Sequence, residues 1–336
     1  MTCITSYNIL AGGYDLRKDG FTQRTQELTS IIRSTQPDVV GLAEAINPAI
    51  IQHPLVIEEI ANSLDMQLVL GTDLDNCDDF QTALLTKLPI VYKKVHSLPG
   101  VLMRPLLEVC VEETDGQQLV LFVAHLTAAF NKGWAGNAIR MREMREILRI
   151  MAQVQDKPHA IMGDFNSMAP SDPFKASFLL RYLVHVDRKQ QSVGIIDGQP
   201  YLAAVVPKSL RFLNPLLQAI PESTLLSALF DLAASFYAPR SPIAQIQAAG
   251  YVDSYRHLHP DSLGFTCPSA APAGRIDFIF ANPALAERLE ACDPILEGGG
   301  FVGSQASDHL AVSATFGLAI KNDDQGIRFA SAAHTH

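Results

Sequence analysis

Polar side chains able to bind a metal ion or move a proton stand at the ends of several short apolar runs in this sequence. They are Asn8, Glu44, His125, Asp164, Asn166, Asp277, Asp308 and His309. Ligands of α/β sheets collect where strands end and loops begin, so these side chains are predicted to converge on one cleft. Their types match the hydrolysis of a phosphate ester, which needs shielded phosphoryl oxygens, an activated water and a stabilised leaving oxygen.

Three of these residues offer oxygen ligands to a hard cation. Mg²⁺ takes oxygens from one or two carboxylates and keeps several waters. Glu44 and Asp308 can supply the carboxylates, and Asn8 can supply an amide oxygen. We therefore predict one or two Mg²⁺ or Mn²⁺ ions at these positions.

A second feature is a candidate pair for activating water. A histidine oriented by a carboxylate can deprotonate water near neutral pH, and Asp277 with His309 can form such a pair. Asp277 lies between Ile276 and Phe278 in an apolar run, so its carboxylate needs a partner if it is buried.

The remaining members are predicted to contact the substrate. Asn166 and His125 can donate hydrogen bonds to phosphoryl oxygens, and Asp164 lies beside Asn166. Each residue also has a structural interpretation when it is taken alone. Asn8 can cap a turn, a lone Glu44 is usually solvated, a single histidine is more often structural, and Asp164 with Asn166 fits an Asx turn. The ordered set carries the prediction.

The elements that position these residues follow from hydrophobic periodicity. Strands are predicted at 4–10, 38–42, 67–70, 82–86, 106–112, 119–124, 159–162, 276–281 and 310–316, and helices at 22–35, 50–64 and 137–154. The last helix is predicted to bury Met144 and Ile147 and to expose Arg140 and Glu143. Early strands alternate with helices and consecutive strands fill the middle, which implies an α/β fold with mixed sheets under outer helices.

The chain between Asn166 and Arg275 is much longer than a return between catalytic strands requires. Within it, residues 201–247 are apolar, helix-like and punctuated by prolines. We predict that this segment is a helical insertion in a catalytic domain spanning 1–320, and that it overhangs the cleft and helps to select the substrate. Residues 321–336 are predicted to be a flexible tail.

Composition sets limits on the class of protein. The 336 residues are 48% hydrophobic and 18% charged, which fits a large α/β domain and excludes collagen, coiled coil and wholesale disorder. A net charge of −9 weighs against non-specific DNA binding without a local basic groove. The five cysteines are widely spaced and indicate reduced thiols. With no signal peptide and no long apolar run, we expect a cytoplasmic protein without a stable membrane span.

Six motifs occur in a fixed order along the chain. They are SYNIL (6–10), PDVVGLAE (37–44), AHL (124–126), GDFNS (163–167), RIDFIF (275–280) and SDH (307–309). In this order they resemble the endonuclease/exonuclease/phosphatase superfamily, which includes the pancreatic-type deoxyribonucleases. The resemblance spans most of the chain. It implies a four-layer αββα sandwich of two mixed β-sheets flanked by helices, with the active site at one rim.

The resemblance also implies a role for each motif residue. Glu44 would be the principal metal ligand, Asn8 would lie near the metal or the phosphate, and Asp308 would serve a metal or its water shell. The residues implied in catalysis are His125, as acid or as hydrogen-bond donor to a phosphate oxygen, and Asp164, which would position or activate the water. Asn166 would bind the scissile phosphate, and Asp277 would pair with His309. Whether Asp164 or His309 is the base stays open.

Differences between the motifs of this chain and those of individual subfamilies exclude only some of the possible substrates. AP endonucleases typically carry Tyr-x-Pro-Asn where this chain has His125-Leu126-Thr127. Inositol-polyphosphate phosphatases carry Trp-Cys-Asp-Arg where this chain has Gly274-Arg275-Ile276-Asp277. Both classes are therefore disfavoured. Nucleic acid, a nucleotide or a phospholipid head group remain as substrates, and the oligomeric state is open.

Three hypotheses follow from these observations. The first is a metal-dependent phosphodiesterase. The second is a DNA or RNA nuclease, for which Arg140, Arg142, Arg145 and Arg149 would form a basic helix face, although a solvated face is the favoured interpretation. The third is a non-catalytic binding protein, which the intact set of carboxylates and histidines argues against.

Overall fold

Two six-stranded sheets form the centre of the protein. The computed structural model describes residues 1–15, 22–50, 52–72, 74, 77, 79–193 and 219–318. The first sheet has the order β11 (Leu289–Ile295), β14 (Ala311–Phe316), β1 (Thr2–Asn8), β2 (Val39–Ile46), β4 (Gln81–Thr86) and β3 (Gln67–Leu70). The second has the order β5 (Ile90–His96), β6 (Leu106–Glu112), β7 (Gln118–His125), β8 (His159–Asp164), β10 (Asp277–Ala281) and β9 (Val252–Asp253). The pairs β1·β2 and β7·β8 are parallel and the other pairs antiparallel, so both sheets are mixed.

The sheets pack face to face through alternate side chains of their strands. Leu84 of the first sheet and Leu121, Met162 and Ile279 of the second share one buried cluster. Gly41 permits close approach, because a Cβ at this position would lie 2.4 Å from Sδ of Met162. In addition, β1 lies close to β8 and β10, which brings the ends of strands from both sheets together.

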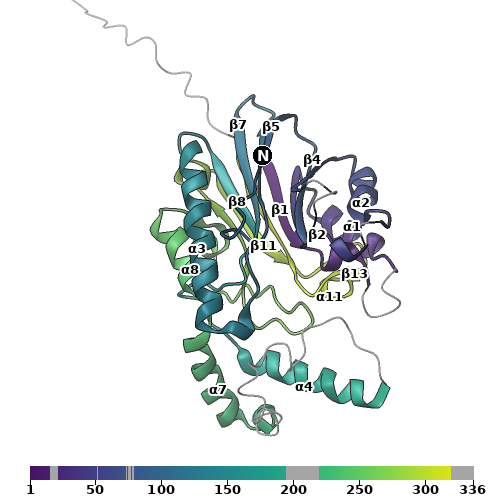
Figure 1. The fold of residues 1–336 in the computed structure, drawn as a ribbon, viewed down its shortest axis with the longest axis vertical. Helices are drawn as coiled ribbons and strands as arrows, with labels where there is room; N and C mark the ends of the chain where they lie inside the picture. The colour runs from purple at the N-terminus through teal and green to yellow at the C-terminus, as the bar shows by residue number, and fades with distance from the viewer. Residues whose placement is uncertain are drawn as a thin grey trace, which may run out of the picture.

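Helices cover both outer faces (Figure 1). α1 (Thr25–Ser34) and α2 (Val56–Leu64) pack on the first sheet, and α3 (Trp134–Met151) and α8 (Ser241–Ala248) pack on the second. The predicted four-layer αββα sandwich is thereby confirmed. Short elements complete the chain: a hairpin of β12 (Glu297–Gly298) and β13 (Phe301–Val302), the helices α9 (Ser254–Leu258), α10 (Pro283–Ala286) and α11 (Gly303–Ala306), and the 3-10 turns at Ala11–Gly13, Pro48–Ile50, Phe130–Lys132 and Ala152–Val154.

A helical unit extends below the sandwich in Figure 1. It consists of α4 (Ala176–Val193), a 3-10 turn at Ile220–Glu222 and α7 (Thr224–Tyr237), with a small core of Leu180, Leu183, Val184 and Ile220. Part of the predicted insertion, 201–218, lies outside the described residues, as does the tail 321–336. The end of the predicted insertion, α8, packs on α3 and buries Ile243 and Ile246 in the sandwich.

Element boundaries differ from the sequence-based expectation where local chemistry intervenes. α2 begins at Val56 instead of residue 50, because Pro54 disfavours the helical conformation for the residue before it, His53, and Leu55 is still extended. β5 was not predicted from the sequence. It is an edge strand, and its adjacent exposed residues Lys93 and Lys94 break the apolar pattern by which strands are predicted. No helix within the described ranges is long and apolar enough to cross a bilayer.

Candidate active site

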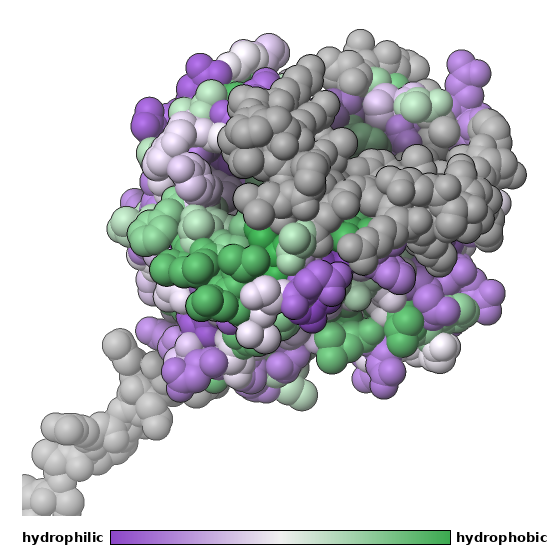
Figure 2. Space-filling view, turned by 90° about the horizontal axis from the view of Figure 1, so that it is seen from below, coloured by the Kyte–Doolittle hydropathy of each residue, from purple (hydrophilic) through white to green (hydrophobic). Residues whose placement is uncertain are grey.

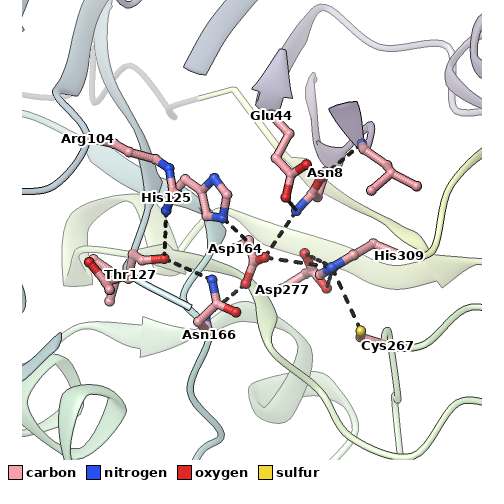
Figure 3. A network of polar contacts seen from close by, with 12 residues as sticks. Asn8, Glu44, Arg104, His125, Thr127, Asp164, Asn166, Cys267, Asp277 and His309 are labelled. Atoms are coloured by element: carbon pink, nitrogen blue, oxygen red, sulfur yellow. Dashed lines mark hydrogen bonds and ion pairs between the residues drawn. The ribbon is translucent and has the colours of Figure 1, made fainter. Parts of the chain in front are cut away.

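The strand register collects the predicted residues at one rim. His125 ends β7 and pairs with Asp164, which ends β8, and Asp164 in turn pairs with Asp277, which begins β10. In the first sheet Asn8 ends β1 and pairs with Ala43, next to Glu44. Because β1 lies close to β8 and β10, these two rows meet (Figure 3). The structure thus brings these sequence-predicted residues together at one rim.

Glu44 is turned into the site by an irregularity in β2. The β2–β4 register shifts between Leu42 and Ile46, and Glu44 has a φ of 51°. Such a bulge re-aims a side chain. The amide of Ala11 donates to Oε2 of Glu44 at 3.0 Å, and Nδ2 of Asn8 donates to Oε1 at 3.3 Å.

Asn8 links the two sheets at the site. Its Nδ2 also donates to Oδ2 of Asp164 at 3.1 Å, while its Oδ1 accepts from the amide of Leu10 at 3.0 Å. Ser307 donates from Oγ to the carbonyl of Asn8 at 2.6 Å, so the loop carrying Asp308 is tied to the end of β1. These bonds fix the relative positions of Asn8, Glu44 and Asp308.

The carboxylates of Glu44 and Asp308 form a site of concentrated negative charge. Both residues are half-buried. Burial raises the pKa of Glu44, and the charge of Asp308 nearby raises it further. Two such carboxylates repel each other unless a cation lies between them, and hard oxygen donors of this kind fit Mg²⁺ or Mn²⁺. The residues present therefore fit a divalent cation.

His309 is oriented by Asp277. Its Nδ1 lies 2.9 and 3.0 Å from the two carboxylate oxygens of Asp277, and all of these groups are buried. Burial alone lowers the pKa of His309, but the negative charge of Asp277 raises it well above the ordinary value. The Nε2 atom faces Asp164, with Oδ2 at 3.7 Å. This is the predicted pair.

Asp164 lies between the two histidines. Its Oδ2 is 3.6 Å from Nε2 of His125, and its Oδ1 accepts from the amide of Asn166 at 2.8 Å. Burial, with the charge of Asp277, raises the pKa of Asp164 to about 7. Asn166 has a φ of 46°, a conformation that asparagine tolerates, and its Nδ2 donates to the carbonyl of Leu126 at 2.8 Å.

The turn after His125 is held by two polar residues of α3. Glu143 accepts from Oγ1 of Thr127 at 2.7 Å and from its amide at 3.1 Å, and Arg140 donates to the carbonyl of Thr127 at 2.9 Å. The expectation that Arg140 and Glu143 are solvated is wrong, because both are buried. A backbone turn at the rim needs hydrogen-bond partners, and these side chains supply them. Arg140 is therefore no part of an exposed basic face with Arg142.

Arg104 is a site residue that the sequence analysis missed. It precedes β6, donates to the carbonyl of Leu126 at 3.3 Å and to Asp79 at 3.3 Å, and lowers the pKa of His125, which burial already holds well below its usual value. Within the described ranges, neither Nε of Arg104 nor Nδ1 of His125 has a hydrogen-bond partner, although both are buried. Buried donors without partners at one rim indicate a ligand-binding position. No spacing in the sequence marks Arg104.

A second group of possible metal ligands lies beside Glu44 and Asp308. Asp164, Asp277 and His309 offer ligand atoms within 4.8 Å of one another. It differs from the predicted set of Glu44, Asn8 and Asp308. We favour Glu44 and Asp308 for the hard cation, because both oxygens of Asp277 are engaged by His309.

The αββα sandwich and the rim of carboxylates and histidines define a phosphoester hydrolase of the nuclease and phosphatase type. In agreement, residues 5–309 match the model of the endonuclease/exonuclease/phosphatase family, and the chain belongs to this family. Its members are phosphoester hydrolases that depend on a divalent cation. A comparison with curated proteins found no match.

Similar solved structures share the fold. An AP endonuclease from Archaeoglobus fulgidus is 15% identical with a TM-score of 0.57, covering 95% of this chain and 100% of that one. A 3' phosphatase from Neisseria bound to product DNA hairpin is 14% identical with a TM-score of 0.53, again over 95% and 100%. Truncated TDP2 from Caenorhabditis elegans is 16% identical with a TM-score of 0.51, over 94% and 98%. At these identities the likeness establishes the fold alone.

Proposed function

We propose that the protein is a Mg²⁺- or Mn²⁺-dependent phosphodiesterase. The observation that carries the proposal is the Asp277–His309 pair, buried beside Asp164 and next to the carboxylates of Glu44 and Asp308. A structural histidine has no need of a carboxylate on Nδ1 and a second carboxylate facing Nε2. This arrangement is typical of a group that exchanges protons with a bound water.

Glu44 and Asp308 are proposed to hold the cation, with Asn8 beside it. When bound, the cation reduces the negative charge on the phosphoryl oxygens and thereby lowers the barrier to attack. The amide of Ala11 and Nδ2 of Asn8 keep the Glu44 carboxylate in place, so the chain holds the ligand geometry before a cation binds.

Asp164 and His309 are proposed to activate the attacking water. Nε2 of His309 and Oδ2 of Asp164 lie 3.7 Å apart, so one water can contact both atoms. Asp277 fixes the imidazole, and Asn8 and the amide of Asn166 fix the two oxygens of Asp164. The proton taken from the water passes to the carboxylate of Asp164, because the raised pKa of His309 leaves that imidazole already protonated.

His125, Asn166 and Arg104 are proposed to bind the phosphate. Burial, with Arg104 nearby, keeps the imidazole of His125 neutral by lowering its pKa, and with its one proton on Nδ1 the ring donates a hydrogen bond to a phosphoryl oxygen. Arg104 adds a fixed positive charge at the same side of the site. An anionic phosphate satisfies the buried donors of Arg104 and His125.

A nuclease is the alternative within the same chemistry. The similar Neisseria structure is a 3' phosphatase bound to a DNA hairpin, and the similar Archaeoglobus structure is an AP endonuclease. The net charge of −9 and the burial of Arg140 argue against a basic groove that binds nucleic acid. We therefore favour a smaller phosphodiester.

A substrate panel tests the proposal. Metal-stripped protein is incubated with bis(p-nitrophenyl) phosphate, nucleotides, oligonucleotides, phosphoinositides and sphingomyelin, with and without Mg²⁺ or Mn²⁺. We expect metal-dependent hydrolysis of the chromogenic diester and of one natural class. Hydrolysis of oligonucleotides alone, with an affinity that falls steeply as salt rises, would establish the nuclease instead.

A further inference from the structure

Glu143 joins two segments of the rim that are remote from each other along the chain. Its Oε1 accepts hydrogen bonds from the amide of Met103 at 3.2 Å and from Oγ1 of Thr127 at 2.7 Å, and its Oε2 accepts one from the amide of Thr127 at 3.1 Å. Met103 precedes Arg104, and Thr127 lies two residues after His125. One buried carboxylate therefore holds both segments that carry the proposed phosphate donors.

The segments held by Glu143 also meet at the carbonyl of Leu126. This carbonyl accepts from Nη1 of Arg104 at 3.3 Å and from Nδ2 of Asn166 at 2.8 Å. Both side chains are proposed to bind the phosphate. Their positions, and that of His125 next to Leu126, therefore depend on the conformation of this turn.

α3 gives the turn a rigid support. The apolar face of the helix is buried in the cluster on the second sheet. Arg140, one helical turn before Glu143, donates to the carbonyl of Thr127 at 2.9 Å. Gly136 lets the loop approach the helix, because a Cβ at this position would collide with the carbonyl oxygen of Ala129. Side chains on a packed helix hold a site more precisely than side chains on loops.

We propose that Glu143 is a positioning residue that holds Arg104 and His125 at a fixed separation for phosphate binding. This inference rests on the proposed function, which assigns both side chains to the phosphate. Glu143 acts through the backbone of Met103 and Thr127. A carboxylate is required because its two oxygens accept from both amides at once. A glutamine has one oxygen, so in either orientation its own N–H group faces an amide N–H and cannot accept from it.

The water-activating residues are held by other partners. Asp277 fixes His309, and Asn8 donates to Asp164. Loss of the hydrogen bonds to Glu143 therefore loosens the phosphate donors while the water-activating groups keep their geometry. Donors that hold the phosphate equally in the ground state and the transition state affect KM and leave kcat nearly unchanged.

Steady-state kinetics test this division between KM and kcat. Wild type, Glu143→Gln and the control Glu146→Gln are assayed with bis(p-nitrophenyl) phosphate at saturating Mg²⁺. Glu146 lies on the same helix and pairs with Arg149. We expect Glu143→Gln to raise KM about tenfold and to change kcat by less than about threefold, and Glu146→Gln to match the wild type. An unchanged KM in folded Glu143→Gln contradicts the proposal.

A milder variant decides the question if Glu143→Gln does not fold. Thr127→Val keeps the shape and the backbone amide of the residue but removes the hydroxyl that donates to Oε1 of Glu143. We then expect KM to rise about threefold with kcat unchanged, and an unchanged KM would contradict the proposal.

Binding of inorganic phosphate tests the site without turnover. The protein is titrated with inorganic phosphate in the presence of Mg²⁺ by calorimetry. We expect Glu143→Gln to raise the Kd about tenfold in the wild-type background but only about threefold in Arg104→Ala, where one of the two positioned donors is gone. A tenfold rise in both backgrounds, or no phosphate binding by the wild type, overturns the proposal. If no phosphate ester is hydrolysed at all, the proposed function fails, and this titration still decides the role of Glu143.

Discussion

The catalytic rim and the helical unit of α4 and α7 are built in opposite ways. At the rim Asn8, Asp164, Asp277 and His309 are buried, and each has defined partners. α7 buries no residue, and its Leu225, Leu229, Leu232 and Phe236 are 55–77% exposed. Figure 2 looks at this end of the molecule, where apolar surface is exposed. The comparison indicates that the sandwich holds the catalytic side chains in place, while the helical unit contributes little to the stability of the sandwich.

The largest expected effect concerns the rim. Changing His309→Ala or Asp277→Asn should each lower kcat by about 10²–10⁴, and the double variant should lose little more, because paired residues act as a unit. Rates are measured with a chromogenic diester under saturating metal. The matched control is His159→Gln, a buried histidine at the other end of β8 that contacts Tyr251 and should leave kcat unchanged. Fully additive losses would show that the two residues do not form a pair.

The second prediction compares stability in the two regions. Phe280→Ala removes a ring buried in the cluster under α3 and should lower the free energy of unfolding by about 3–5 kcal/mol. Leu229→Ala on α7 should change it by less than about 0.5 kcal/mol. Urea unfolding followed by circular dichroism measures both. Equal losses would mean that α7 is packed as tightly as the sandwich.

The third prediction concerns pH. Because burial raises the pKa of Asp164 from 3.8 to about 7, folding favours its protonated form. That contribution is fully present below the unfolded pKa and is lost as pH rises through about 7; the raised pKa of His309 acts in the same direction. The melting temperature of metal-stripped wild type should therefore fall more between about pH 5 and pH 8 than that of Asp164→Asn, while the lowered pKa of His125 opposes the fall in both proteins. A steeper fall in the variant would contradict the assigned shift.

The smallest effect is expected from removing the helical unit. Replacing residues 178–238 with a Gly/Ser linker leaves α8 and its buried Ile243 in place. The residues that flank the replaced segment are tied to the chain beside the catalytic motifs. The amide of Met168, two residues after Asn166, donates to the carbonyl of Pro239 at 2.8 Å, and the amide of Lys175 donates to the carbonyl of Ala273 at 2.9 Å. Hydrolysis of a small diester should persist while the ranking of larger substrates changes. An unchanged ranking in a folded protein would make the unit purely structural.

Periodicity predicted mixed sheets under outer helices, and the resemblance of the six motifs to a known family implied the four-layer sandwich. The convergence of the site was predicted because polar residues stand at strand ends, which is a local signal. Prediction from the sequence failed where partners are remote along the chain. Arg140 and Glu143 fit a solvated face by periodicity, yet the turn at Thr127 requires them inside. Arg104 and Cys267 stand in no motif, and only folding brings them to His125 and His309. Local patterns carry no information about such neighbours.

Metal dependence through Glu44 is the central claim, and one titration tests it most directly. Mn²⁺ is added to metal-stripped wild type, Glu44→Gln and the exposed control Glu58→Gln, while metal binding and hydrolysis of bis(p-nitrophenyl) phosphate are followed in the same samples. We expect no hydrolysis without metal, equal titrations for wild type and Glu58→Gln, and weakened binding with almost no turnover for Glu44→Gln, because the variant lacks a carboxylate charge in a hard-cation site. Hydrolysis by the stripped protein, or an unchanged titration in Glu44→Gln, would contradict the account.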